Sequence, residues 1–130
     1  MKAKRFRRKK MKTRLTHTRA NVSDLYRSIE WYEKTLGFKC YGADITDTYE
    51  YAQFEYGEGA AFSIMVAGTG GTNARFNFAV DDVDTLWEEL KDKVTVIEPI
   101  ATMPWGNRKF TIADPDGNEI GLVQEGYTEV

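Results

Sequence analysis

The stretch VSDLYRSIEWYEKTLGF (22–38) decides the fold, because its opening returns 58 positions later in VDDVDTLWEEL (80–90). Both stretches repeat apolar residues at the spacing of a helix that buries one face. The pattern therefore predicts two amphipathic helices. The repeated opening indicates that one structural module occurs twice in the chain.

Polar residues and a glycine mark the expected helix ends. Asn21 and Ser23 are the candidate caps of the first helix, over 24–36, and Gly37 suits its C-terminal end. The second helix begins behind two aspartates, and the expected caps are Asp81 and Asp82.

Extended segments surround each helix. A strand is expected before the first helix at 12–20 and before the second at 74–80. Three more strands follow each helix, at 38–43, 48–56 and 60–67, and then at 94–100, 108–113 and 118–124. A tight DPDG turn (114–117) separates the last two. The order predicts an α+β domain of two tandem βαβββ modules (12–67 and 74–125, with a linker at 68–73), whose curved mixed sheets surround a concave cleft.

Composition favours one globular domain in a reducing compartment. The chain has 130 residues, and the 42% that are hydrophobic suffice for one core. Cys40 is the only cysteine, so no intrachain disulfide can form and a cysteine-rich metal site is excluded. No apolar run reaches membrane-helix length, and no apolar signal segment follows the basic N-terminus. We expect a cytoplasmic protein without a membrane partner.

Basic residues are concentrated at the N-terminus. Residues 1–14 hold nine Lys or Arg and no acid, which leaves nine basic and twenty acidic residues elsewhere. A basic arm is able to contact nucleic acid, but the acidic body is unlike a nucleic-acid-binding domain. Residues 1–11 are interpreted as a disordered arm or an extended start of the chain, and no nucleic-acid partner is expected.

Three stretches carry a resemblance to a known family. They are LTHTRANVSDLYRSIEWYEKTLGF (15–38), FNFAVDDVDTLWEEL (76–90) and PWGNRKFTIADPDGNEIGLVQ (104–124). In this order and spacing they resemble the vicinal oxygen chelate superfamily, which includes glyoxalase, bleomycin resistance proteins and extradiol dioxygenases. The resemblance covers nearly all of 13–125 and is strongest to metal-free, glyoxalase-like or bleomycin-resistance-type members. It implies the duplicated fold and a homodimer.

Metal-dependent members of this superfamily carry one ligand on each of four strands. The resemblance places these four positions on His17, on Ser63 (or Met65), on Arg75 and on Gly121. Only His17 matches, since Arg75 is a permanent cation and Gly121 has no side chain. One histidine cannot form a two-histidine iron site. No cofactor is expected, and a poor divalent-metal site of His17 with Glu50 or Glu55 stays open.

Strand alternation selects side chains for the cleft. Arg75 and Asn77 alternate with phenylalanines expected to face the helix, so they face the concave side. Arg75 then either binds a ligand oxyanion through its guanidinium fork or forms a salt bridge. The candidate partners of that salt bridge are Glu50, Glu55 and Glu119.

Other side chains leave alternatives open. His17 is a general base, a polar lining residue or a buried, hydrogen-bonded histidine. Tyr51 and Gln53 share one face of their strand, and which face lines the cleft is open. Trp105 precedes Arg108 in a loop expected at the rim. The candidate ligand-binding residues are His17, Tyr51, Gln53, Ser63, Met65, Arg75, Asn77, Trp105, Arg108 and Gly121.

Three functions follow from the resemblance. The favoured one is binding of a small organic molecule, without metal, in an aromatic and cationic cleft. The second is a metal-dependent lyase of the lactoylglutathione type, an isomerase or a dioxygenase, in which a metal polarises substrate oxygens. The third is a metal-free enzyme in which Arg75 stabilises an oxyanion and His17 acts as base.

Overall fold

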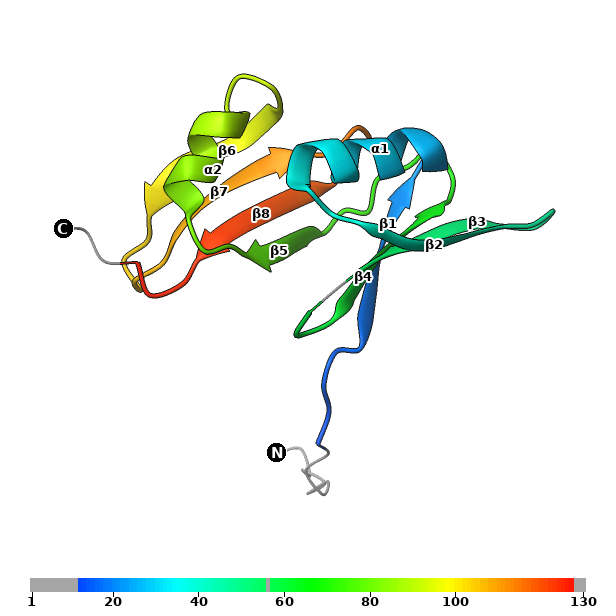
Figure 1. The fold of residues 1–130 in the computed structure, drawn as a ribbon, viewed down its shortest axis with the longest axis horizontal. Coiled ribbons are helices and arrows are strands. Elements are labelled where there is room, and N and C mark those ends of the chain that lie inside the picture. Colours follow the sequence, from blue (N-terminus) through cyan, green and yellow to red (C-terminus); the bar gives the residue numbers. More distant parts are fainter. Residues whose placement is uncertain (1–11, 56, 128–130) are drawn as a thin grey trace, which may run out of the picture.

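The order of elements repeats once along the chain, as Figure 1 shows for this computed structural model. Residues 12–55 and 57–127 are described, and the arm expected at 1–11 lies outside them. The elements are β1 (His17–Val22), α1 (Leu25–Leu36), β2 (Cys40–Ile45), β3 (Glu50–Phe54), β4 (Ala61–Val66), β5 (Arg75–Ala79), α2 (Val83–Leu90), β6 (Thr95–Thr102), β7 (Arg108–Ala113) and β8 (Glu119–Gln124). The predicted α+β fold of two βαβββ modules is confirmed.

Each helix begins after an aspartate that caps its first turn. The side chain of Asp24 accepts a hydrogen bond from the backbone N–H of Arg27 at 3.1 Å. Asp82 accepts one from the backbone N–H of Thr85, also at 3.1 Å. These side-chain oxygens satisfy N–H groups that have no partner within the helix. The two caps are 58 positions apart, like the repeated openings in the sequence.

The helix ends correct one prediction and confirm another. Asn21 and Ser23 do not cap α1, because β1 extends through Val22 and the first free helical N–H groups lie beyond them. Ser23 instead donates a hydrogen bond to Asp116 at 2.6 Å. Gly37 ends α1 with a positive φ of 70°, a left-handed conformation that costs glycine little.

Strand pairing sets where the first strand begins. The strand predicted over 12–20 starts only at His17, whose ladder partner Ala61 is the first residue of β4. Residues 12–16 precede the start of the β1/β4 ladder and have no ladder partner in β4. A Thr-rich composition favours a strand, but a strand also needs a neighbour to pair with. The predicted tight turn is confirmed, since Gly117 donates its N–H to the carbonyl of Asp114 at 3.0 Å.

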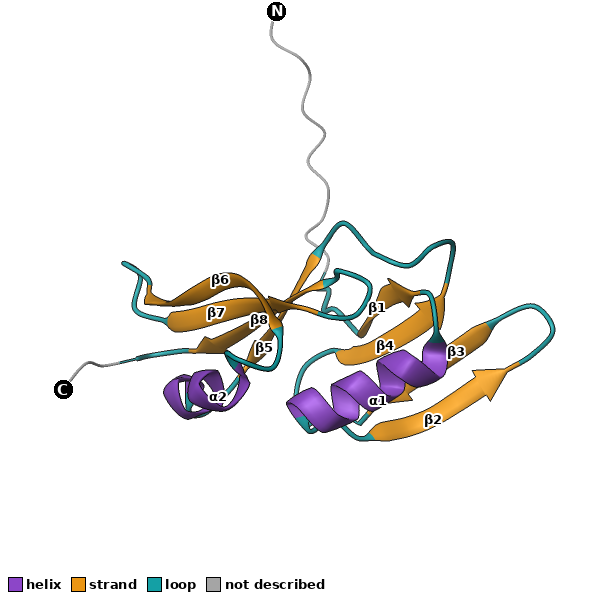
Figure 2. Cartoon of the chain, turned by 90° about the horizontal axis from the view of Figure 1, so that it is seen from above, coloured by secondary structure: helices purple, strands orange, loops and turns teal. Residues whose placement is uncertain are grey.

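Each module forms a four-stranded mixed sheet. The strand orders are β1-β4-β3-β2 and β5-β8-β7-β6, with β1/β4 and β5/β8 parallel and the other pairs antiparallel. β1 and β5 are therefore outer strands, and neither sheet closes. Both helices lie on the same side of the two sheets (Figure 2). In 12–55 and 57–127, no helix is long and apolar enough to cross a membrane.

Aromatic side chains from both modules meet beneath α1. Tyr32 is fully buried, and its ring lies 5.4 Å from that of Phe54 and 5.2 Å from that of Phe62. Phe62 in turn lies 5.2 Å from Phe78 of β5. The apolar faces of the two modules thus share one core.

A buried polar contact also joins the modules. The Tyr32 hydroxyl donates to the Asp114 carboxylate at 2.7 Å, and the Asn118 amide donates to the same oxygen at 2.8 Å. Asn118 also donates to the carbonyl of Asn21 at 2.9 Å. Burial, followed by the neighbouring Asp114 charge, raises the pKa of Tyr32 well above its usual range. The β7–β8 turn is thereby fixed against α1 and β1.

Candidate functional site

The first sheet has one face covered by α1 and one open face. Phe54 and Phe62 contact Tyr32 of α1, so the residues that alternate with them point away from the helix. The first open face carries His17, Arg19, Asn21, Tyr51, Gln53, Ala61, Ser63 and Met65. The structure thus settles which side of β3 faces outward: the side with Tyr51 and Gln53.

The second sheet is built in the same way. Phe110 of β7 packs against Trp87 of α2, with ring centroids 5.1 Å apart, and this fixes the covered side. The second open face carries Arg75, Asn77, Ala79, Lys109, Thr111, Glu119, Gly121 and Val123. Strand β6 adds Glu98, which pairs with Thr111 in the ladder. Arg75 and Asn77 therefore lie on the predicted side of β5.

The four positions where metal-binding relatives carry ligands divide between the two open faces. His17 is exposed, with Nδ1 2.9 Å from the hydroxyl of Thr16, so the buried-histidine interpretation is wrong. Ser63 is buried and donates its hydroxyl to the carbonyl of Thr18 at 2.6 Å. Arg75 and Gly121 lie on the other sheet. The two hollows described below include Arg75 in the lining of one but not His17, Ser63 or Gly121.

Arg75 lies between two carboxylates. One guanidinium nitrogen is 2.8 Å from Glu119 and the other pairs with Glu98, which also accepts from the Thr111 hydroxyl at 3.0 Å. The hydrogen bond that Arg75 donates to Glu119 raises the pKa of Arg75. The hydrogen bond from the Thr111 hydroxyl, followed by the charge of Arg75, lowers the pKa of Glu98. The salt-bridge alternative to Glu119 is confirmed, with Glu98 as a second partner. Two negative charges compensate the Arg75 cation.

The residues at the four positions do not fit a metal. Within 12–55 and 57–127, no three His, Cys, Asp or Glu side chains gather where they could hold an ion. An exposed imidazole, a buried hydroxyl, a guanidinium and a glycine also differ from the donor sets that zinc, nickel or iron prefer. Glu50 lies on the same side of β3 as Phe54, toward α1 and opposite His17. Glu55 pairs with Lys39 at 4.0 Å.

A hollow of about 240 Å³ lies on the second open face beside Trp105. This Trp105 hollow is lined by Asn77, Phe78, Ala79, Trp105, Asn107, Lys109, Val123 and Glu125. Trp105 is 70% exposed in the β6–β7 loop, where Gly106 donates its N–H to Met103 at 3.0 Å. The hollow thus combines one large exposed aromatic ring with several polar side chains.

Arg108 lies on the other side of its sheet from the Trp105 hollow. It alternates with Lys109 and donates to Asp84 of α2 at 2.9 Å. Its guanidinium also lies 5.2 Å from the centre of the Tyr127 ring. The structure therefore places Arg108 near α2, away from the open face.

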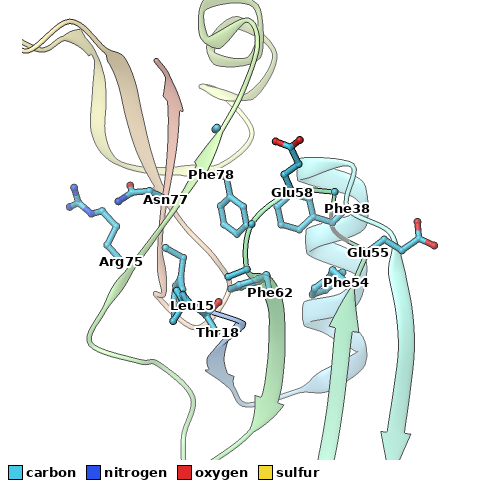
Figure 3. Close-up of a pocket in the computed structure, with 15 residues that line it drawn as sticks. Leu15, Thr18, Phe38, Phe54, Glu55, Glu58, Phe62, Arg75, Asn77 and Phe78 are labelled. Atoms are coloured by element: carbon cyan, nitrogen blue, oxygen red, sulfur yellow. The ribbon is translucent and has the colours of Figure 1, made fainter. Parts of the chain in front are cut away.

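A second, larger hollow lies on the helix side, between β5 and the β3–β4 hairpin. Its volume is about 480 Å³, and its lining includes Leu15, Thr18, Phe38, Phe54, Phe62, Phe76 and Phe78. Figure 3 shows Phe78 directed toward Phe62 and Phe38, while Arg75 and Asn77 leave β5 on its opposite side. We call it the phenylalanine groove. Strand alternation predicted that Phe76 and Phe78 face the helix, but the sequence did not predict an opening between the modules.

Arg19 is an open-face cation that the sequence interpretation missed. It lies beside Ser63 in the ladder, and its guanidinium contacts the sulfur of Met65 at 2.9 Å. Among the described residues it has no carboxylate partner. Alternation from His17 would have found it, because residues two apart in a strand share a face.

Comparisons with known proteins agree with this architecture. A model of the Glyoxalase/Bleomycin resistance protein/Dioxygenase superfamily matches residues 14–122. No curated protein matches the sequence. Among solved structures, the chain is similar to a glyoxalase/bleomycin resistance protein from Streptomyces sp. CB03234, with 26% identity, a TM-score of 0.70, and coverage of 85% of this chain and 99% of that one.

Two further structures share the fold. TnmS3, an antibiotic-binding protein from Streptomyces sp. CB03234, has 24% identity and a TM-score of 0.75, with coverage of 90% of this chain and 99% of that one. A glyoxalase I variant from Zea mays has 25% identity and a TM-score of 0.72, covering 88% of this chain and 45% of that one. With the family model spanning both modules, the chain belongs to the Glyoxalase/Bleomycin resistance protein/Dioxygenase superfamily.

Proposed function

We propose that this protein binds a small organic molecule on the open faces of its sheets, without using a metal. The observation that carries the proposal is the set of residues at the four ligand positions. His17, Ser63, Arg75 and Gly121 offer one imidazole, and the Arg75 guanidinium, which has no acceptor atom and pairs with Glu98 and Glu119, cannot serve as a metal ligand. A site of this chemistry suits hydrogen bonding and stacking better than Lewis-acid catalysis.

The Trp105 hollow is the best candidate for the contact with the ligand. An exposed indole beside apolar Ala79 and Val123 offers a stacking surface, and Asn77 and Lys109 offer polar contacts. One similar protein, TnmS3, is described as an antibiotic-binding protein, which supports a small-molecule ligand here. The volume of about 240 Å³ suits a two-ring molecule or one part of a larger ligand.

We also propose that two copies of the chain assemble and complete the cleft. His17 and Ser63 lie on one sheet and Arg75 and Gly121 on the other, and both helices lie on the same side of the sheets (Figure 2). β1 and β5 are outer strands of their sheets. A second copy would place its own first open face opposite the second open face of this chain.

A thermal-shift screen tests the binding proposal. Bleomycin-type glycopeptides and planar aromatic antibiotics are added to the full-length protein and to a Trp105→Ala variant. Several of the planar compounds are expected to raise the melting temperature of the wild type by mass action, and the shift shrinks in the variant. A Trp105→Phe variant keeps an aromatic ring and most of the shift. Absence of any shift in the wild type would count against a small-molecule-binding role.

Elemental analysis of protein purified without chelator tests the proposal that the protein uses no metal. The expected content is far below one transition metal per chain. About one nickel, zinc or iron per chain, lost on His17→Ala substitution, would contradict it.

Sedimentation velocity tests the proposed assembly of two copies. The expected mass is that of two chains, and a monomer that still binds ligand would refute the shared cleft.

A further inference from the structure

The amide of Asn77 fills the space beside Gly121. A Cβ added at Gly121 would overlap Asn77 Oδ1 and would lie 3.1 Å from Asn77 Cγ and 3.8 Å from Arg75 Cδ. The two residues are ladder partners on β5 and β8. The absence of a side chain at Gly121 therefore lets the Asn77 amide lie flat on the second open face.

This amide is available to a ligand. Asn77 is exposed, and across 12–55 and 57–127 neither its nitrogen nor its oxygen has a protein hydrogen-bond partner. It borders both the Trp105 hollow and the phenylalanine groove. A carboxamide offers two donors and one acceptor group, so it can pair with an amide through two opposed hydrogen bonds.

The charged groups around Asn77 carry no excess of positive charge. Arg75 is paired with Glu98 and Glu119, and the lining of the Trp105 hollow contains one cation, Lys109, and one anion, Glu125. A carboxylate or phosphate entering this hollow would lose hydration without meeting an excess of positive charge. An uncharged polar group avoids that penalty.

We propose that the Trp105 hollow recognises an uncharged, planar molecule that carries a carboxamide, with its ring stacked on Trp105 and its amide paired with Asn77. Gly121 is a positioning residue, because it leaves the room in which the Asn77 amide lies. This inference rests on the proposed function and names the ligand class for the same site.

Calorimetric titration of the full-length protein with two matched probes tests it. Naphthalene-2-carboxamide and naphthalene-2-carboxylate have the same ring and nearly the same shape but differ in charge. The amide is expected to bind about tenfold more tightly. Asn77→Ala lowers amide affinity about fivefold to tenfold, the size of one or two neutral hydrogen bonds, and leaves carboxylate affinity unchanged.

A Gly121→Ala variant tests the positioning role. The atom that its Cβ meets is the end of a flexible side chain, so the fold is retained and the Asn77 amide turns away. Amide affinity should fall about as much as in Asn77→Ala, and adding Gly121→Ala to Asn77→Ala should have little further effect. Gly42→Ala is the matched control, since a Cβ there meets nothing within 4 Å. Melting temperatures of all variants verify folding.

The titrations distinguish failure of the carboxamide inference from failure of the proposed small-molecule binding. Equal or tighter binding of the carboxylate, or independent effects of the two substitutions, overturns the carboxamide inference. If other planar compounds bind the wild type but the carboxamide does not, the inference alone fails. If no planar compound binds, the proposed function fails with it.

Discussion

Replacing Tyr32 with phenylalanine tests how the two modules are held together. The change removes the hydroxyl that donates to Asp114 at 2.7 Å and leaves the buried ring in place. Asp114 keeps hydrogen bonds from Asn118 and Asp116, so the carboxylate is not left alone. A hydrogen bond to a charged group stabilises a protein by about 1.5–3 kcal/mol. Because Asp114 keeps its other donors, we expect Tyr32→Phe to lower the free energy of unfolding by about 2 kcal/mol.

Urea denaturation followed by tryptophan fluorescence measures this loss. Tyr32→Phe should lower the urea midpoint at neutral pH without changing the m-value. Tyr26→Phe is the matched control, because Tyr26 lies on the same helix with 65% of its surface exposed, and its substitution should change stability by less than about 0.5 kcal/mol. Equal midpoints for the two variants would refute the argument.

The pH dependence of the same pair has a defined sign. The pKa of Tyr32 is raised in the folded protein, so above about pH 10 the unfolded chain releases a phenol proton that the folded chain retains. Titration of Tyr32 then lowers the free energy of unfolding of the wild type by up to about 1.4 kcal/mol per pH unit. Tyr32→Phe has no phenol at this position and lacks this contribution. The gap between wild type and variant should narrow above pH 10, and a constant gap would contradict the account.

Three substitutions test the scaffold. Gly37→Ala places a side chain at φ +70° with no steric contact, so the free energy of unfolding measured by urea titration should fall by about 1 kcal/mol. Gly57→Ala is the control: Gly57 has no positive φ, and its substitution should change the free energy of unfolding little. Phe110→Ala empties a fully buried site and should cost about 3–5 kcal/mol, seen as a large drop in melting temperature; a small drop would contradict its core role. Asp82→Ala removes the α2 cap and destabilises at neutral pH. Because the Thr85 hydroxyl lowers the pKa of Asp82, the difference from wild type should vanish as pH falls through that lowered pKa, and persistence in acid would argue against the cap.

Local chemistry predicted much of the fold. Helix periodicity, the stop at Gly37 and the tight turn ending at Gly117 depend on residues close in sequence, and all three are confirmed. The cap of α1 was placed at Asn21 or Ser23 instead of Asp24, because three residues of types that can cap a helix lie within four positions. Pairing of β1 with the distant β4 excludes Asn21, and the hydrogen bond to Asp116 of the other module engages Ser23.

The site was less predictable, because its decisive contacts are long-range. Glu98 reaches Arg75 from a strand whose pairing with β7 contains two register shifts, which a sequence pattern cannot position. The overlap between Gly121 and Asn77 likewise depends on the parallel register of β5 and β8. Arg19 was predictable from alternation, because it lies two residues from His17 in the same strand.

Metal dependence of ligand binding is the most direct test of the central claim. A planar compound selected by the thermal-shift screen is titrated calorimetrically into the protein, once with a chelator and once with excess zinc. Metal-free recognition on the open face predicts the same affinity in both titrations, and loss of that affinity in Trp105→Ala. Binding that appears only with zinc, and that disappears in His17→Ala, would contradict the account.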